Sequence, residues 1–449
     1  MMGVDHKHKP GKTTEELIKP WKLPPPKTYV FKNANVIHPV DGSIDLNTTI
    51  KISSGLIESV SRELPSSGLD ADVTVDLRGK YVCPGLIDAH VHVSAVPGEK
   101  DLGRCIGMDP AVSMTRQPFV CEQMLRRGFT TIRDCGGASL ALKEAIRDDV
   151  FPGPRLFIAN HALSQTGGHG DLRSSHDHSE CCGGHITGIG VLCDGVPECI
   201  KAAREQLRTG ADFIKIMGGG GVASPTDRLE NTQFTAEEIR AVCEVARSYN
   251  TWVTAHAYTP QAIRHAIDNG VRGIEHGNFI DRETAKYMAE KGVYLTPTLI
   301  AYEAMSRFPG FLPAESEVKN REVLGRGLSA LELAWEAGVK MCYGSDLLGP
   351  LGVEQTKEFG LRARVLSKVQ VLQSATVNAA EMLGQAETLG QIKAGYAADV
   401  LVLNANPLEA MEVLDRPEEH VLAVLKEGRV RVSRWSALAE EGRPTGMIE

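Results

Sequence analysis

The sequence of 449 residues contains no apolar run that approaches the roughly 20 residues needed to cross a bilayer. Its first 20 residues, MMGVDHKHKPGKTTEELIKP, also lack the apolar core of a signal peptide. The formal net charge of -8 argues against nucleic acid or an anionic membrane as a partner. We therefore expect a cytoplasmic protein that binds neither nucleic acid nor membrane.

Two common signatures of structural and catalytic sites are also missing. The ten cysteines form no CxxC pair, which argues against a structural zinc ribbon, and most are predicted to be buried in a reducing compartment. The adjacent Cys181 and Cys182 lie in the Gly- and His-rich segment 160–195 and receive no role. No GxSxG motif is present, so nothing points to a serine nucleophile of that type.

The composition along the chain divides it into three parts. Residues 1–27 are polar and rich in Pro and Lys, which predicts an extended arm. Segments 28–81 and 389–449 contain short alternating strands with glycine turns, and we expect them to form one small β-sandwich domain built from both chain ends. The segment 82–388 alternates strands with amphipathic helices and forms the third part.

The segment 82–388 has the strand and helix count of a (β/α)8 TIM barrel. Helices are expected at 196–210, 235–250 and 260–270, the second starting with the cap signal of Thr235. The eight strands are expected at 82–93, 129–136, 155–163, 211–218, 252–258, 273–277, 293–300 and 340–346. Because strand–helix alternation also fits a doubly wound sheet, periodicity alone leaves both folds open.

The placement of polar residues favours the barrel. Side chains able to bind metal recur near the carboxyl ends of the predicted strands, where barrel chemistry gathers: His90, His92, Lys215, His256, His276 and Asp346. Two residues apart on one strand, His90 and His92 project to the same face. Imidazoles with a carboxylate suit zinc or another first-row metal. Asp346 also has a second interpretation, as a helix cap or turn residue.

Five features in order resemble the amidohydrolase superfamily of urease-like, metal-dependent hydrolases. They are PGLIDAHVH, the lysine of the fourth strand, TAHAY, IEHG and GSD. The resemblance runs from about Tyr29 to GQIKAGYAADVLVLNANPL near the C-terminus. The stretches ALSQTGGHGD and KIMGGGGVAS are most similar to the prolidase-like, carboxypeptidase-like and ochratoxin-hydrolysing amidase members. The resemblance implies a (β/α)8 barrel with a flanking β-domain and a homo-oligomer.

The resemblance also implies a metal centre with two divalent ions, either zinc or, alternatively, manganese or cobalt. His90, His92 and Asp346 would hold one ion, and His256 with His276 would hold the other. Lys215 would join the two ions after carbon dioxide converts its amine to a carbamate. The chemistry of lysine agrees, because an ammonium has no acceptor for a cation, whereas burial favours the neutral amine.

The predicted reaction is hydrolysis of an amide C–N bond, in a peptide, an N-acyl amino acid or an ochratoxin-type amide, by a metal-activated hydroxide. Asp346 would carry the proton to the departing amine. Tyr258 would stabilise the oxyanion, or alternatively only cover the barrel mouth. His169 would contact the substrate, or alternatively be a solvated loop histidine. A carbamate or phenylurea hydrolase and a non-catalytic scaffold are the alternative functions.

Overall fold

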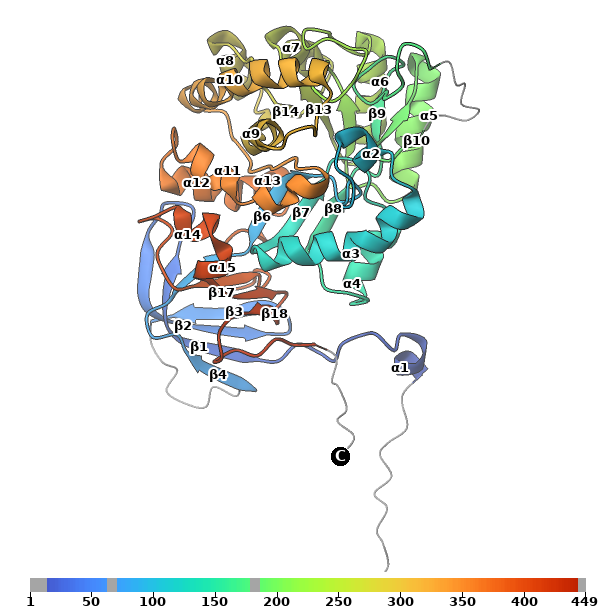
Figure 1. Ribbon diagram of the computed structural model, residues 1–449. Coiled ribbons are helices and arrows are strands. Elements are labelled where there is room, and N and C mark those ends of the chain that lie inside the picture. The colour runs from blue at the N-terminus through green and yellow to red at the C-terminus, as the bar shows by residue number, and fades with distance from the viewer. Residues whose placement is uncertain (1–13, 63–70, 178–185, 443–449) are drawn as a thin grey trace, which may run out of the picture.

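The computed structural model describes residues 14–62, 71–177 and 186–442. The chain has an α/β fold, with one sheet-rich end and a larger part in which strands alternate with helices (Figure 1). Cys181 and Cys182, together with the outermost residues of the predicted arm and of the C-terminal segment, lie outside the described ranges. None of the described helices is long and apolar enough to span a membrane.

One sheet contains strands from both ends of the chain. Its order is β18-β17-β16-β5-β1-β2-β3, with β4 paired to β1. The bounds are β1 Tyr29–Ile37, β2 Ile44–Ser53, β3 Leu56–Ser61, β4 Val73–Asp76, β5 Tyr81–Pro84, β16 Val400–Leu403, β17 Val421–Lys426 and β18 Arg429–Ser433. The antiparallel pairing of β5 with β16 joins the two ends. Buried side chains such as Phe31, Val402 and Leu425 give this sheet its own apolar core.

The strand predicted over 82–93 is divided in the structure. β5 belongs to the terminal sheet, whereas β6, Leu86–Val91, pairs in parallel with β7, Phe129–Asp134. Gly85 lies between them, so close to the next strand that a Cβ there would be 2.1 Å from Thr130 Oγ1. The prediction of one continuous strand was therefore wrong, because the chain changes sheets at this glycine.

The remaining parallel strands form two groups. β6, β7 and β8 make a three-stranded sheet, and β9, β12, β13, β14 and β15 lie side by side in a seven-stranded sheet with β10 and β11 at one end. The bounds are β8 Arg155–Ile158, β9 Ala162–Ser164, β10 Ile186–Thr187, β11 Gly190–Leu192, β12 Ile214–Met217, β13 Val253–Ala257, β14 Gly273–His276 and β15 Tyr294–Thr296.

Two of the strands predicted for the segment 82–388, at 155–163 and 340–346, are not continuous strands in the structure. The strand predicted over 155–163 is split into β8 and β9, because Asn160 between them has a left-handed backbone with φ of 57°. The strand predicted over 340–346 makes only an isolated bridge, between Leu295 and Met341. The same segment nevertheless connects two groups, since the Ala89 N–H of β6 donates to the Tyr343 carbonyl at 2.8 Å.

Helices surround these parallel strands (Figure 1). The cap predicted at Thr235 is confirmed: its side chain and that of Glu238 form a capping box at the start of α6. The described part of the predicted arm includes a short helix, α1, rather than being wholly extended. The bounds are α1 Thr14–Ile18, α2 Leu102–Ile106, α3 Pro110–Arg126, α4 Leu140–Arg147, α5 Gly195–Arg208, α6 Ala236–Ser248, α7 Pro260–Asp268, α8 Arg282–Glu290, α9 Leu299–Arg307, α10 Ala314–Glu336, η1 Gly349–Glu354, α11 Lys357–Arg362, α12 Lys368–Ser374, α13 Val377–Met382, α14 Glu412–Asp415 and α15 Pro417–His420.

Candidate active site

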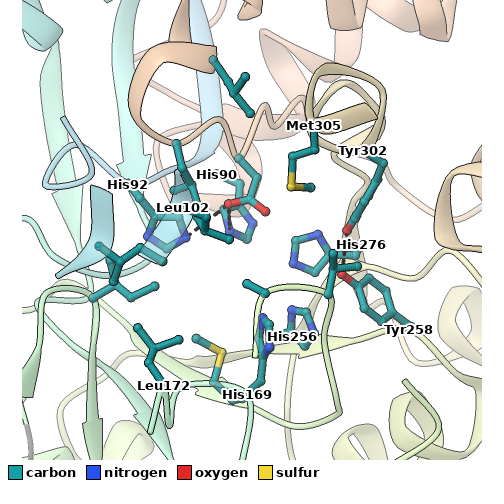
Figure 2. A pocket seen from close by; sticks show the side chains of 18 of the residues that line it. His90, His92, Leu102, His169, Leu172, His256, Tyr258, His276, Tyr302 and Met305 are labelled. Atoms are coloured by element: carbon teal, nitrogen blue, oxygen red, sulfur yellow. Dashed lines mark hydrogen bonds and ion pairs between the residues drawn. The ribbon is translucent and has the colours of Figure 1, made fainter. Parts of the chain in front are cut away.

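All the predicted site residues line one cavity at the carboxyl ends of the parallel strands (Figure 2). The cavity is small, about 60 Å³. The residues that the sequence analysis singled out and that line it are His90, His92, His169, Lys215, His256, Tyr258, His276 and Asp346. Asp346 reaches the cavity although no regular strand precedes it; its backbone N–H donates to the His90 carbonyl at 2.8 Å.

Two of the histidines come from β6 and the residue after it, and each has one ring nitrogen held by a partner. His90 Nδ1 lies 2.7 Å from the Glu275 carboxylate. His92 Nδ1 lies 2.8 Å from the Gly136 carbonyl. The opposite nitrogens converge on one carboxylate oxygen: Asp346 Oδ1 is 3.5 Å from His90 Nε2 and 3.3 Å from His92 Nε2. Both rings are therefore oriented with Nε2 toward Asp346.

The other two histidines are held in the same manner. His256 Nε2 lies 3.0 Å from the Gly220 carbonyl, so its Nδ1 is the nitrogen left for a ligand. His276 Nδ1 lies 2.7 Å from Thr298 Oγ1, which leaves Nε2. Because metal-bound imidazoles usually donate their second N–H to such an outer partner, this pattern is the one expected of metal ligands.

The electrostatics also suit a cation. Burial lowers the pKa of His90 to about 4 and holds those of His256 and His276 well below the usual range, so these rings are neutral at neutral pH. Burial alone would raise the pKa of Asp346, but His90 and His92 outweigh it and keep the pKa low. Neutral rings with free lone pairs beside an ionised carboxylate are a donor set for a divalent metal.

Lys215, on β12, is 1% exposed. Within the described residues no ion pair to its ammonium is found, and it borders the cavity together with the four histidines. A buried ammonium without a partner is costly. The position therefore requires something that compensates or replaces this charge.

Sequence reasoning missed the residues that support His90. The Glu275 carboxylate accepts hydrogen bonds from His90, from Thr254 and, at 2.7 and 2.8 Å, from Arg133 Nη2. Arg133 and Glu275 are both fully buried. The sequence did contain a signal for this pair, since Arg133 and Glu275 each lie inside a predicted buried strand. A buried charge requires a partner of opposite charge, so each residue indicated that such a partner exists.

Among the residues that the structure describes, two groups of potential ligand atoms lie close enough together to hold a metal. One is His90, His276 and Asp346, and the other is His90, Cys135 and Glu275. The second group does not suit a metal, since Glu275 already pairs with Arg133 and burial raises the pKa of the Cys135 thiol to about 12. The first group remains the candidate metal centre.

His169 belongs to a hydrogen-bonded chain rather than to the solvent. Its Nδ1 lies 2.8 Å from Ser224 Oγ, and that hydroxyl donates to the Asp227 carboxylate. Ser224 thus accepts from His169, which assigns the tautomer with hydrogen on Nδ1 and an acceptor at Nε2. The ring stacks on His256 with centroids 4.2 Å apart. This contact requires a glycine nearby, because a Cβ on Gly221 would lie 2.0 Å from His169 Cε1.

The series of hydrogen bonds that begins at His169 ends at a lysine of α10. Lys319 Nζ donates to the carbonyls of Gly221, Ser224 and Asp227 at 3.1, 3.0 and 2.7 Å. It also lies 3.3 Å from Asp227 Oδ1. One ammonium therefore holds the turn that positions His169.

Tyr258 is oriented as a hydrogen-bond donor to the cavity. The Tyr302 O–H donates to the Tyr258 oxygen at 3.0 Å, and the Val222 backbone also bonds this phenol oxygen. Burial raises the pKa of Tyr258, which keeps the phenol protonated. With both lone-pair sides of its oxygen used, the hydrogen of Tyr258 is left for another acceptor.

Comparison with known proteins identifies similar sequences and structures. The model of the Amidohydrolase family matches residues 81–431. Ochratoxinase from Aspergillus niger is 33% identical over 414 residues, which are 88% of this chain and 85% of the relative. Among solved structures, a prolidase complexed with N-methylphosphonate-L-proline is 41% identical with a TM-score of 0.86, covering 91% of this chain and 100% of its own. A Xaa-Pro dipeptidase with bound methionine is 30% identical with a TM-score of 0.81, covering 90% and 99%.

Proposed function

The chain belongs to the amidohydrolase family, and from this premise we propose that it hydrolyses an amide C–N bond at a centre of two divalent metal ions. The observation that carries the proposal is the orientation of the four buried histidines: each has one ring nitrogen bonded outward, and the second nitrogens of His90 and His92 converge on the Asp346 carboxylate. We propose zinc, with manganese or cobalt as alternatives, and these ligands: His90, His92, Lys215, His256, His276 and Asp346.

We propose that Lys215 is carbamylated. The ammonium first loses one proton; the Nζ lone pair of the neutral amine then adds to the carbon of carbon dioxide and a second proton is released, so that an anion with two acceptor oxygens replaces a cation. The buried position without an ion pair supports this change, since the carbamate can bind cations that an ammonium repels.

Divalent ions bound there would supply Lewis acidity and activate water at neutral pH. Asp346, an ionised acceptor, takes a proton from the attacking water and delivers it to the departing nitrogen. The Tyr258 O–H donates to the oxyanion formed from the carbonyl, because the Tyr302 hydroxyl already occupies one side of its oxygen. His169, whose Nδ1–H donates to Ser224 Oγ, accepts a hydrogen bond from the substrate at Nε2.

The proposed substrate is a peptide or N-acyl amino acid. The 41% identical prolidase and the 33% identical ochratoxinase support this class. We further propose that 82–388 forms a closed (β/α)8 barrel beside a β-sandwich from 28–81 and 389–449. The hydrogen bonds from 340–346 to β15 and to β6 support closure.

A hydrolysis panel tests the function. The metal-loaded protein is offered N-acyl amino acids, Xaa-Pro and other dipeptides, carbamates and phenylureas, and we expect turnover of the first two groups. Turnover confined to the last two groups would favour the alternative function, and no turnover together with no metal bound would favour a scaffold.

The lysine is tested separately. We expect Lys215→Ala to bind fewer divalent ions per chain and to lose hydrolytic activity, because the carbamate cannot form. Lys286→Ala, at an exposed position on α8, is the matched control and should behave as the wild type. Full metal content and near-normal turnover in Lys215→Ala would eliminate the carbamate.

A further inference from the structure

A second and larger cavity adjoins the catalytic one. It has a volume of about 700 Å³, against about 60 Å³ for the catalytic cavity. Leu102, Ile106, Leu172 and Ala223 line both, so the two spaces share a wall. Figure 2 shows Leu102 and Leu172 on the side of the catalytic cavity nearest His92 and His169, across from Tyr302. We call this second space the outer cavity.

The lining of the outer cavity is mostly apolar. The side chains of Met108, Pro110, Met114, Pro225 and Pro313 complete it, and the first three come from α3 and the turn before it. These residues surround a space of the size that binds small organic ligands, roughly 300–1,000 Å³. They offer dispersion contacts and a dry surface, rather than hydrogen bonds.

The polar side chains around the outer cavity already have partners. Gln117 Nε2 donates to Ser113 Oγ at 3.2 Å, and Ser113 Oγ donates to the Ser94 carbonyl at 2.6 Å. The Arg173 guanidinium forms an ion pair with Asp171 at 2.7 Å. A ligand here would therefore gain most from an apolar group and little from a charge.

From the two adjoining cavities we infer that the natural substrates are amides with a large apolar group on one side of the scissile bond, and that the outer cavity binds this group. The inference rests on the proposed function, because the catalytic cavity would hold the amide. The catalytic cavity, at about 60 Å³, is far smaller than the roughly 300–1,000 Å³ that holds a whole small organic ligand. The bulk of any larger substrate must therefore lie outside it, and the outer cavity adjoins it directly.

The experiment measures how kcat/KM depends on the length of the apolar group of the substrate. N-acyl glycines from acetyl to octanoyl lengthen the acyl side, and N-acetyl amino acids from alanine to norleucine lengthen the amine side. Each buried methylene stabilises binding by ~0.8 kcal/mol, so kcat/KM should rise about fourfold per methylene in one of the two series. The series that shows the rise identifies the side of the amide that occupies the outer cavity.

Variants connect the effect to the outer cavity. Met114, on α3, lines it and is 54% exposed, so Met114→Arg should introduce a charge without disturbing the core. We expect the ratio of kcat/KM between the longest and the shortest substrate of the responsive series to fall at least tenfold in this variant. Pro225→Arg, at another residue of the lining, should act in the same direction. Val112→Arg, on the same helix but outside the cavity lining, is the matched control and should keep the full dependence.

Calorimetric binding of the same compounds separates this inference from the proposed function. If no amide is hydrolysed but N-octanoyl glycine binds more tightly than N-acetyl glycine, and Met114→Arg removes the difference, the outer cavity is supported and the hydrolase is refuted. If amides are hydrolysed at rates independent of chain length in both series, the hydrolase is supported and the outer cavity is refuted. Absence of both hydrolysis and length-dependent binding refutes both.

Discussion

Replacing Glu275 by glutamine tests whether the buried charge pair behind His90 supports both the fold and the proposed metal centre. Glutamine keeps the shape of the side chain and removes its charge. Arg133 then remains in the interior without a counter-ion; its Nη1 already has no hydrogen-bond partner, and Nη2 depends on Glu275. Breaking a buried pair by removing one partner costs about 3–5 kcal/mol.

The effect on stability is measured on metal-free protein, so that it does not depend on ion binding. At a urea slope of about 3 kcal/mol/M, the expected loss lowers the unfolding midpoint by about 1 M or more. Glu336→Gln is the matched control, because it breaks the exposed pair of Glu336 with Arg282, at 2.9 Å, and should cost no more than about 1 kcal/mol.

The effect on the metal centre is measured by titrating the folded variant with zinc. Glu275 accepts from His90 Nδ1 and so fixes the ring that turns Nε2 to the cavity. Loss of such an outer partner usually weakens metal affinity by about 10–100-fold. If the free energy of unfolding of Glu275→Gln lies within about 1 kcal/mol of that of Glu336→Gln, and the variant binds zinc as the wild type does, the charge pair has neither role.

Two further changes examine other contacts. Lys319→Met removes the ammonium that holds the Gly221–Asp227 turn, so His169 should lose its fixed Nδ1–H tautomer. Histidine ¹⁵N chemical shifts of the metal-free protein measure this, with Lys286→Met as the control. Unchanged His169 shifts in Lys319→Met would contradict the expectation. Thr235→Ala removes the capping box of α6 and should cost about 1 kcal/mol in thermal unfolding, whereas Thr235→Ser should retain most of it.

The sequence predicted that the proposed metal ligands would meet around one space, because that inference depends only on two general rules. Alternation along a strand puts His90 and His92 on one face, and parallel strands bring their carboxyl ends together. These rules require no knowledge of loops. The structure accordingly places all six predicted ligands around one cavity.

The sequence could not predict contacts that depend on residues far apart in the chain. Arg133 and Glu275 are separated by 142 positions, and nothing local indicates that they meet. The same holds for His169, which the sequence left between a substrate contact and a solvated loop residue. Its chain of partners ends at Lys319 on α10, whose reach to the Gly221 turn follows from tertiary packing.

The strand predictions failed where the backbone itself changes conformation. Periodicity of apolar residues does not reveal the positive φ of Asn160, which ends β8, nor that of Asp346, 49°. At Asp346 this departure has a consequence for the site. Asp346 has this left-handed backbone, and its N–H donates to the His90 carbonyl. In this conformation the Asp346 carboxylate lies 3.3 Å from His92 Nε2.

The lysine of β12 and the glycines after it act on different parts of the same centre. Lys215 is buried among the proposed ligands, whereas Gly220 and Gly221 allow two other segments of the polypeptide, at Arg228 and His169, to approach closely. A Cβ on Gly220 would lie 1.8 Å from the Arg228 carbonyl oxygen, and one on Gly221 would enter the His169 ring. The Gly220 carbonyl also holds His256 Nε2. A side chain at either glycine would therefore displace the residues that orient His256 and His169, even though neither glycine could itself bind a metal through a side chain.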